Sequence, residues 1–429
     1  MIQTPSSPGN QRHGRRRVAC AALCGLALAA LLAERAHALD QADVERTVRW
    51  AESGLRTVTG RLASDAYEGR DNDTPGSLRA QRYLIAKLRA IGPGLDSSRS
   101  GDDAYRQPFE FRGQRGTNLL AIVPGRELPD EYVVVGAHYD HVGRCRSVPG
   151  GGRVCNGALD NATGVAAVLA LGNALRRLPE PPRRSVVLAL WDAEEDGLVG
   201  SEYYVRNPVV PLERTVAYVN FDLLGGRMLP SLAHISFAVA PETGGELLKR
   251  VVADAVAAEG LGTRQLSYIF GQERSDYANF VAGSVPTVFF SDSEVPCYHT
   301  TGDELHRVDW DKLRAQSRIA FRVAVALAES EERPTFVPPN PALATYDDAV
   351  VLSEVFRLGR KDLALFRGPD QQRLLELDAR MRTIVDEGPD AFDGEDVGAT
   401  LTAAVQAIRM IGDLECSPRA TRRLARKND

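Results

Sequence analysis

Short apolar runs and longer helix-spaced segments alternate along most of the chain. Five mostly apolar runs have the length and β-branched content of buried strands, at residues 132–135, 185–191, 215–221, 235–239 and 286–290. Shorter strands are expected at 108–111 and 118–123, and apolar residues recur at helical spacing in segments 163–178, 242–259, 276–281 and 310–329. This alternation predicts an α/β fold with a mixed, mostly parallel central sheet flanked by helices.

The two ends of the chain have a different pattern. Residues 40–91 have mostly helical spacing, with a turn-rich stretch at 67–70 and an amphipathic helix at 77–91. Four prolines mark a linker at 334–341, and three amphipathic helices are expected in a C-terminal helical extension over 342–429. Two interpretations of the extension remain open: a helical pack that extends the core, or a lid or partner surface.

The first 38 residues have the pattern of a signal peptide. Arg15, Arg16 and Arg17 precede an apolar run over 18–32, and the small-x-small sequence at 36–38 would be the cleavage site. The apolar run is shorter than the roughly 20 residues of a membrane span, so an uncleaved anchor is the less favoured alternative. We therefore expect an exported protein, periplasmic or secreted, without a stable membrane span, whose residues 39–333 form the main domain.

Charge and cysteine content limit the possible partners and compartment. The net charge is −5, and it falls to −9 without residues 1–38, which carry five Arg and one Glu. No basic stripe remains, which argues against nucleic acid as a partner. Four cysteines remain, an even number that suits an oxidising compartment. We favour a Cys145–Cys155 disulfide around a glycine-rich loop; a Cys297–Cys416 pair would tie the extension beside the site.

Side chains of the types that ligate metals follow the expected strands. The residues concerned are His138, Asp140, His141, Asp160, Glu194, Glu195, Asp222 and His299. The ends of neighbouring strands in an open α/β sheet converge on one crevice. Imidazole and carboxylate groups together suit zinc or a similar divalent ion. The sequence therefore predicts a metal centre at this edge of the sheet.

Five ordered motifs resemble those of one enzyme family. GAHYDH, GALDNATG, AEEDGLVGS, NFD and YHTTGD, in this order, are similar to motifs of the co-catalytic di-zinc aminopeptidases and glutamate carboxypeptidase-like enzymes. The resemblance covers about residues 50–330, with LASDAYEGR as a prelude, and leaves the extension unmatched. It implies a zinc exopeptidase-like fold, peptide substrates and two zinc ions, or other divalent metals in their place.

The resemblance also implies a role for each ligand-type residue. It assigns five metal ligands: His138 and Asp222 to one ion, Glu195 and His299 to the other, and Asp160 as the bridge between them.

Two further acids are implied to be catalytic. Asp140 would orient His138, and Glu194 would be the general base for a water or hydroxide shared by the two ions. His141 is not expected to bind metal, and Ser275-Asp276 is expected to cap a helix.

Among the possible reactions we favour removal of N-terminal residues from peptides. A carboxypeptidase would need a cation for the terminal carboxylate, for which Arg227 or Arg274 could serve. A glutaminyl cyclase-like enzyme would use a single zinc, and a non-catalytic relative would be expected to lack ligands or the base. No oligomeric state is indicated by the pattern.

Overall fold

The computed structural model describes residues 41–149, 152–340 and 343–414, together with Met1, Leu39 and Cys416. The described residues from Gln41 onward form one compact unit, and most of the expected signal peptide lies outside the described residues. One described stretch, Ala158–Leu175, is long and apolar enough to cross a membrane, but 94% of it is buried inside the protein. This stretch therefore behaves as a core helix.

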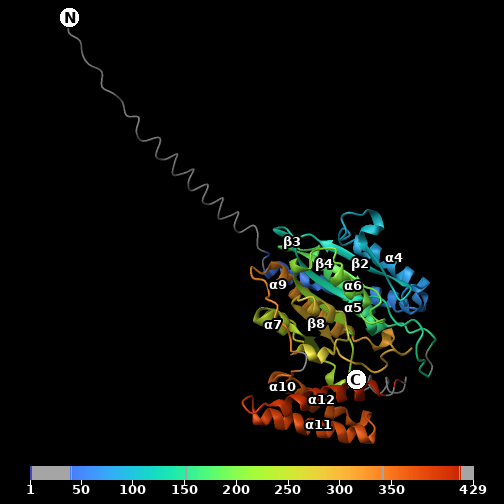
Figure 1. Ribbon diagram of the computed structural model, residues 1–429, viewed down its shortest axis with the longest axis vertical. Coiled ribbons are helices and arrows are strands. Elements are labelled where there is room, and N and C mark those ends of the chain that lie inside the picture. Colours follow the sequence, from blue (N-terminus) through green and yellow to red (C-terminus); the bar gives the residue numbers. More distant parts are fainter. Residues whose placement is uncertain (2–38, 40, 150–151, 341–342, 415, 417–429) are drawn as a thin grey trace. The chain divides into compact units, whose positions relative to one another are not determined.

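An eight-stranded sheet forms the centre of the protein (Figure 1), in the order β1-β2-β4-β3-β5-β8-β6-β7. The strands are β1 (Arg106–Phe111), β2 (Gln114–Val123), β3 (Leu128–His138), β4 (Arg184–Trp191), β5 (Thr215–Asp222), β6 (Ile235–Val239), β7 (Gly262–Leu266) and β8 (Thr287–Ser291). The central four, β4, β3, β5 and β8, are parallel neighbours. The predicted mixed, mostly parallel sheet is confirmed.

The parallel register aligns the strand ends that carry the chemistry. His138 at the end of β3 pairs with Trp191 at the end of β4. Asp222 at the end of β5 pairs with Ser291 at the end of β8. Because parallel strands end on the same edge, the loops that follow all four strands open into one crevice.

Helices cover both faces of the sheet. The helices of the described residues are α2 (Gln41–Val48), α3 (Leu55–Leu62), α4 (Pro75–Arg89), α5 (Thr163–Leu175), α6 (Val199–Arg206), α7 (Gly245–Ala257), α8 (Tyr277–Ala282), α9 (Trp310–Glu329), α10 (Tyr346–Gly359), α11 (Gly368–Glu387) and α12 (Gly394–Gly412). Both α5 and α9 contact β3, and α6 and α8 lie on the opposite face. Within β4, Leu188 approaches Gly172 of α5, whereas the ring of Trp191 lies 5.1 Å from that of Tyr204 in α6. Every residue of β4 is buried, as its continuous apolar run predicts.

The sequence analysis did not predict one strand, β7, and one helix, α6. β7 pairs in parallel with β6, but its sequence GTRQL has neither an apolar run nor a regular alternation. Its strand conformation comes from pairing with β6. Helix α6 is short and was not distinguished from the acidic motif that precedes it.

A buried arginine connects the N-terminal helices to the crevice. Arg70 is 0% exposed, and its guanidinium donates hydrogen bonds to five backbone carbonyl oxygens, those of Leu62, Tyr139, Asn156, Gly157 and Asp160, at 2.6–3.4 Å. Burial lowers the pKa of Arg70 to about 10, so the side chain stays charged at neutral pH. Arg70 thus fixes the backbone on both sides of the loops that carry His138 and Asp160.

The turn that delivers Arg70 requires a glycine. Gly69 has φ +71°, and a Cβ there would lie 2.6 Å from the backbone of Gly143 and Cys155. Only glycine combines this left-handed conformation with such a close approach of backbones. The turn-rich stretch at 67–70 therefore packs directly against the segment between the predicted metal ligands His138 and Asp160.

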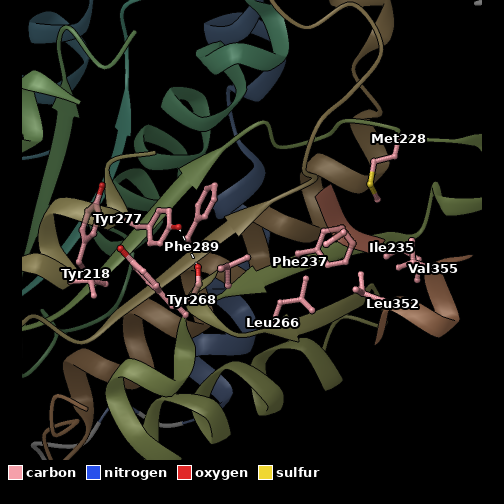
Figure 2. Packing of buried hydrophobic residues seen from close by; sticks show 14 of the residues in the cluster. Tyr218, Met228, Ile235, Phe237, Leu266, Tyr268, Tyr277, Phe289, Leu352 and Val355 are labelled. Carbon is pink, nitrogen blue, oxygen red and sulfur yellow. Dashed lines mark hydrogen bonds between the residues drawn. The ribbon is translucent and has the colours of Figure 1, made fainter. Parts of the chain in front are cut away.

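The C-terminal extension packs on the edge of the sheet. Helix α10 contacts β7, and α11 and α12 pack against α10. Leu352 and Val355 of α10 are buried in one hydrophobic cluster with Phe237 of β6 and Leu266 of β7 (Figure 2). These contacts support the interpretation that the extension continues the core.

Two disulfides join loops at the crevice. Cys145 is bonded to Cys155, and Cys297 is bonded to Cys416, with Cα–Cα distances of 5.8 and 5.0 Å. Both pairings agree with the sequence analysis. The second one ties the end of the extension to the loop that carries His299.

We expect Arg70→Lys to lower the free energy of unfolding by about 3 kcal/mol or more. A lysine ammonium has three donors, so it leaves at least two of the five buried carbonyls unpaired. Denaturant unfolding would measure the loss. Arg79→Lys is the matched control, because Arg79 pairs with Glu68 at the surface and such pairs contribute up to about 1 kcal/mol. Equal stability of the two variants would contradict a structural role for Arg70.

We expect a chain that ends at Asn340 to aggregate or to lose cooperative unfolding. The truncation uncovers Phe237 and Leu266 and removes buried side chains of α10, each of which contributes roughly 1.5–3 kcal/mol. Thermal unfolding and binding of a hydrophobic dye would measure the effect. A control truncation after Cys416 keeps the described part of the extension and should unfold like the full chain. A stable, dye-free protein ending at Asn340 would contradict this packing.

Candidate metal centre

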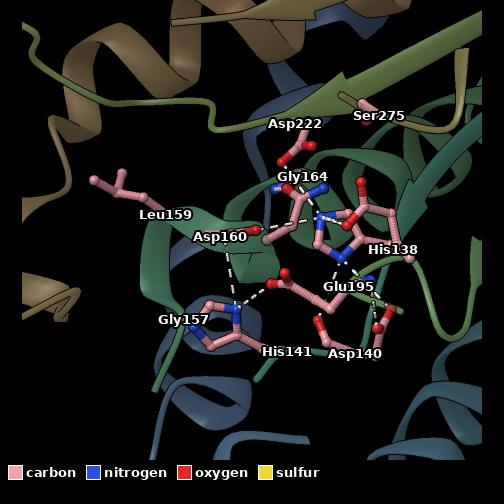
Figure 3. A network of polar contacts seen from close by, with 12 residues as sticks. His138, Asp140, His141, Gly157, Leu159, Asp160, Gly164, Glu195, Asp222 and Ser275 are labelled. Carbon is pink, nitrogen blue, oxygen red and sulfur yellow. Dashed lines mark hydrogen bonds and ion pairs between the residues drawn. The ribbon is translucent and has the colours of Figure 1, made fainter. Parts of the chain in front are cut away.

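The ends of four neighbouring strands, and the loops that follow them, bring the ligand-type residues together (Figure 3). His138 ends β3, Asp222 ends β5, and Glu195 lies in the loop after β4. Asp160 comes from the turn Ala158–Ala162 before α5. His299 comes from the loop after β8. All seven predicted site residues lie at this crevice.

The first cluster of ligand-type atoms consists of His138, Asp160 and Asp222. The Nε2 atom of His138 lies 3.3 Å from Oδ1 of Asp160 and 3.4 Å from Oδ1 of Asp222. All three residues are buried. They come from the two central strands and the adjacent turn, so the sheet itself sets their spacing.

The second cluster consists of His141, Asp160, Glu195 and His299. The Nε2 atom of His299 lies 2.9 Å from Oε2 of Glu195 and 3.1 Å from Oδ2 of Asp160. The Nδ1 atom of His141 lies 2.7 Å from Oε1 of Glu195. Asp160 therefore belongs to both clusters, with one carboxylate oxygen facing each.

These residues fit divalent cations. Oδ2 of Asp160 and Nε2 of His299 are buried and face each other, yet neither has a hydrogen-bond partner among the described residues. Several carboxylates share this crevice, and buried anions are costly unless a cation compensates them. Nitrogen and oxygen donors in two groups of three and four suit zinc or a similar ion.

Asp140 holds the first cluster from behind. Its Oδ1 lies 3.5 Å from Nδ1 of His138, on the side of the ring away from Asp160 and Asp222. Its Oδ2 accepts a hydrogen bond of 3.2 Å from the backbone N–H of Glu195. Asp140 thus connects the β3 loop with the β4 loop, the position from which carboxylates orient metal-bound histidines.

Glu194 lies beside the clusters without belonging to either. Its Oε2 is 3.8 Å from Nε2 of His138, and the residue is 9% exposed. Burial raises the pKa of the Glu194 carboxyl well above its ordinary value. A carboxyl group that holds a proton readily, next to a metal site, suits proton transfer.

The structure adds three residues that the sequence analysis did not assign. His141 was not expected to bind metal, but its fully buried side chain lies against Glu195 and belongs to the second group of ligand-type atoms. Asp303 accepts hydrogen bonds from the backbone N–H groups of Leu159 and Asp160 at 2.9 and 3.0 Å. The partners of His141 and Asp303 lie in distant segments of the chain, so the spacing of residues in the sequence could not predict these contacts.

Asp276 is the third such residue. It occupies the N-cap position of α8, as expected, but its side chain makes no cap hydrogen bond and is 0% exposed. Burial raises its pKa to about 7. Its neighbour Ser275 accepts a hydrogen bond of 2.8 Å from Nδ2 of Asn220, next to the end of β5. The predicted position at the start of the helix is therefore correct, but the side chains of this pair are buried in the protein rather than capping the helix.

A cavity of about 100 Å³ opens beside the first cluster, with Asp222, Tyr298 and Arg274 in its lining. The ring of Tyr298 stacks on that of His299, with centroids 3.8 Å apart. The guanidinium of Arg274 lies over the ring of Tyr298, 5.4 Å from its centroid, and pairs with Glu294 at 3.0 Å. The loop that carries His299 therefore lines part of the cavity.

Sequence comparison finds relatives among peptidases. The leupeptin-inactivating enzyme 1 of Streptomyces exfoliatus is 33% identical over 235 residues, which cover 54% of this chain and 46% of the relative. Aminopeptidase NAALADL1 of Mus musculus is 38% identical over 144 residues, 31% of this chain and 17% of the relative. A probable glutamate carboxypeptidase, LAMP1 of Arabidopsis thaliana, is 28% identical over 238 residues, 50% of this chain and 32% of the relative. The match thus spans less than half of each of these proteins.

Solved structures with the same fold include an aminopeptidase and a cyclase. The LapA aminopeptidase of Legionella pneumophila has a TM-score of 0.53 at 18% identity, covering 68% of this chain and 77% of its own. Glutaminyl cyclase of Porphyromonas gingivalis has a TM-score of 0.52 at 17% identity, covering 63% of this chain and 96% of its own. At this identity the similarity establishes the fold alone.

A family model supplies the remaining comparison. Residues 118–324 match the model of peptidase family M28, and this segment contains every residue of the two clusters. The resemblance to metal-dependent exopeptidases carried by the five motifs is thereby confirmed, and the segment that holds the candidate metal centre is the one that matches peptidase family M28.

Proposed function

We propose that the protein is an exported, zinc-dependent aminopeptidase that hydrolyses the N-terminal peptide bond of its substrates. The observation that carries the proposal is Asp160, whose two carboxylate oxygens face two separate donor groups. A site for one metal has no need of a second group of donors. Two groups that share one carboxylate suit a pair of ions.

In this proposal His138 and Asp222 would hold one zinc ion, Glu195 and His299 would hold the other, and Asp160 would contribute a carboxylate oxygen to each. The distances within both clusters support this assignment. When bound, the two ions would lower the pKa of a water molecule and polarise the carbonyl group of the scissile peptide bond.

The protein's own residues then move the protons. The carboxylate of Glu194 accepts a proton from the attacking water and donates it to the leaving amine nitrogen. Asp140 keeps the ring of His138 oriented, because it faces the Nδ1 atom of the ring. Arg70 holds the backbone of Asp160 in place through its peptide oxygen.

The charged groups near the site favour the aminopeptidase reaction over the carboxypeptidase reaction. A carboxypeptidase needs a cation for the terminal carboxylate. Arg274 is the single cation among the described residues that line the cavity, and it pairs with Glu294. Arg227 pairs with Asp309 at 2.6 Å. Both candidate cations are therefore already neutralised by carboxylates of the protein.

The two disulfides support export. Disulfides persist in oxidising compartments such as the periplasm and the extracellular space. Cys145–Cys155 and Cys297–Cys416 both brace the crevice, so the site would be less rigid in a reducing compartment. The expected signal peptide at 1–38 agrees with this proposal.

We expect Glu194→Gln to lose roughly 100- to 10,000-fold in kcat while it keeps its metal. Glutamine retains the shape of the side chain but cannot accept a proton. The measurements are turnover of aminoacyl p-nitroanilides and metal content by elemental analysis. Glu202→Gln, on the exposed side of α6, is the matched control. An active Glu194→Gln enzyme would rule out the general-base role, and turnover of N-blocked peptides by the wild type would favour the carboxypeptidase.

We expect substitutions in the two clusters to lower the metal content of the protein by different amounts. The wild type should hold about two zinc ions per chain, since each cluster supplies one set of donors. Asp222→Asn and His299→Ala should each retain about one ion after dialysis, and Asp160→Asn, which weakens both clusters, should retain fewer than either. His306→Ala is the control, because His306 lies outside both clusters. A wild type with one ion would instead support a cyclase-like site.

A further inference from the structure

The cavity beside Asp222 is lined by both polar and apolar side chains. Asp222, Arg274 and Tyr298 are among the polar ones, next to the proposed reaction centre. Its inner wall on the sheet side is formed by the side chains of Phe237, Val239, Leu266, Phe270 and Phe289. A site of this kind receives an apolar group and orients it through a few polar contacts at the mouth.

The opposite wall of the cavity comes from the C-terminal extension. Leu352 and Val355 of α10 line it, together with four residues of α12: Ala404, Ala407, Ile408 and Ile411. Figure 2 shows Leu352 and Val355 across from Phe237 and Leu266. The match to the peptidase family ends at residue 324, so this wall belongs to the part of the chain outside that match.

Covalent and ionic contacts fix this wall relative to the metal-ligand loop. Cys416, just beyond α12, is bonded to Cys297, two residues before His299. In α10, Glu354 forms a bidentate pair with Arg264 of β7, at 2.7 and 3.0 Å. A wall that is held in this way can discriminate between side chains of different size, because it cannot yield to an oversized one.

We propose that the C-terminal extension determines substrate specificity: α10 and α12 close a pocket for a bulky apolar side chain on the residue to be released. This inference rests on the proposed function, since it takes the peptide bond beside Asp222 as the reacting one. A volume of about 100 Å³ gives room for roughly seven to ten water-sized atoms, the size of a leucine or phenylalanine side chain. The lining residues that α10 and α12 contribute are all apolar, so these two helices offer no charged partner to the side chain of a substrate.

Substitutions on α12 test the proposal with alanine, leucine and phenylalanine p-nitroanilides. Ala407→Phe fills the pocket, so kcat/KM for the leucine and phenylalanine substrates should fall roughly 10- to 100-fold while that for the alanine substrate is kept. Ile408→Ala enlarges the pocket and should shift the preference toward phenylalanine. Val405→Phe adds the same bulk at a position of α12 that is 55% exposed and outside the lining, and should leave the preference unchanged.

The outcomes separate the two proposals. Turnover with an unchanged substrate ratio in both Ala407→Phe and Ile408→Ala would overturn the role of the extension and leave the aminopeptidase intact. Absence of turnover by the wild type on all three substrates would overturn the aminopeptidase. The pocket would then be tested by thermal shift with L-phenylalaninamide, which should stabilise the wild type and Val405→Phe but not Ala407→Phe. Equal shifts in all three proteins would overturn the pocket as well.

Discussion

The crevice depends on one buried cation that binds backbone rather than acid. Arg70 directs its donors to five peptide oxygens, so it joins α3, the loop after β3 and the turn before α5 without donating a hydrogen bond to any carboxylate of the two clusters among the described residues. An arginine paired with Asp160 would have occupied the very oxygens that the clusters share. The guanidinium instead contributes positive charge at a distance, while the carboxylates stay available for cations.

As a result, several buried carboxyl groups lie together in the crevice. Asp140, Asp160, Glu194 and Asp222 are each at most 9% exposed, within one crevice. Like charges at such separations repel, and burial disfavours their ionised forms. Cations that bind the folded crevice and not the unfolded chain would add their binding free energy to the stability of the fold. Stability and activity are therefore coupled at the same residues.

The sequence could predict those parts of the site that lie on strand ends. His138 and Asp222 directly end apolar runs, and neighbouring parallel strands place such residues together whatever their separation in the sequence. The same reasoning could not find Arg70, whose partners lie up to ninety positions away, or β7, whose strand conformation comes from pairing with β6. Helical spacing predicted the helices of the extension. It could not predict that small side chains of α12 would face the cavity, because spacing defines a helix face but not its partner.

His299, a proposed metal ligand, lies in a loop rather than at a strand end, so its backbone must be held by contacts outside the sheet. Both His299 and Cys297 adopt positive φ values, 50° and 78°, a conformation that costs free energy for residues other than glycine. Cys297 is bonded to the end of the extension. Thr300, the residue after His299, forms an isolated β-bridge with Arg146, which lies inside the loop closed by the Cys145–Cys155 disulfide.

The ligand loop is therefore held from two sides by two disulfide-braced segments. On one side lies the wall of the cavity, and on the other lies the loop that follows β3. A movement of the extension would be transmitted through Cys297 to His299, so the proposed substrate pocket and the second cluster share one frame. In our proposal, this coupling lets a segment outside the family match act on the geometry of the site.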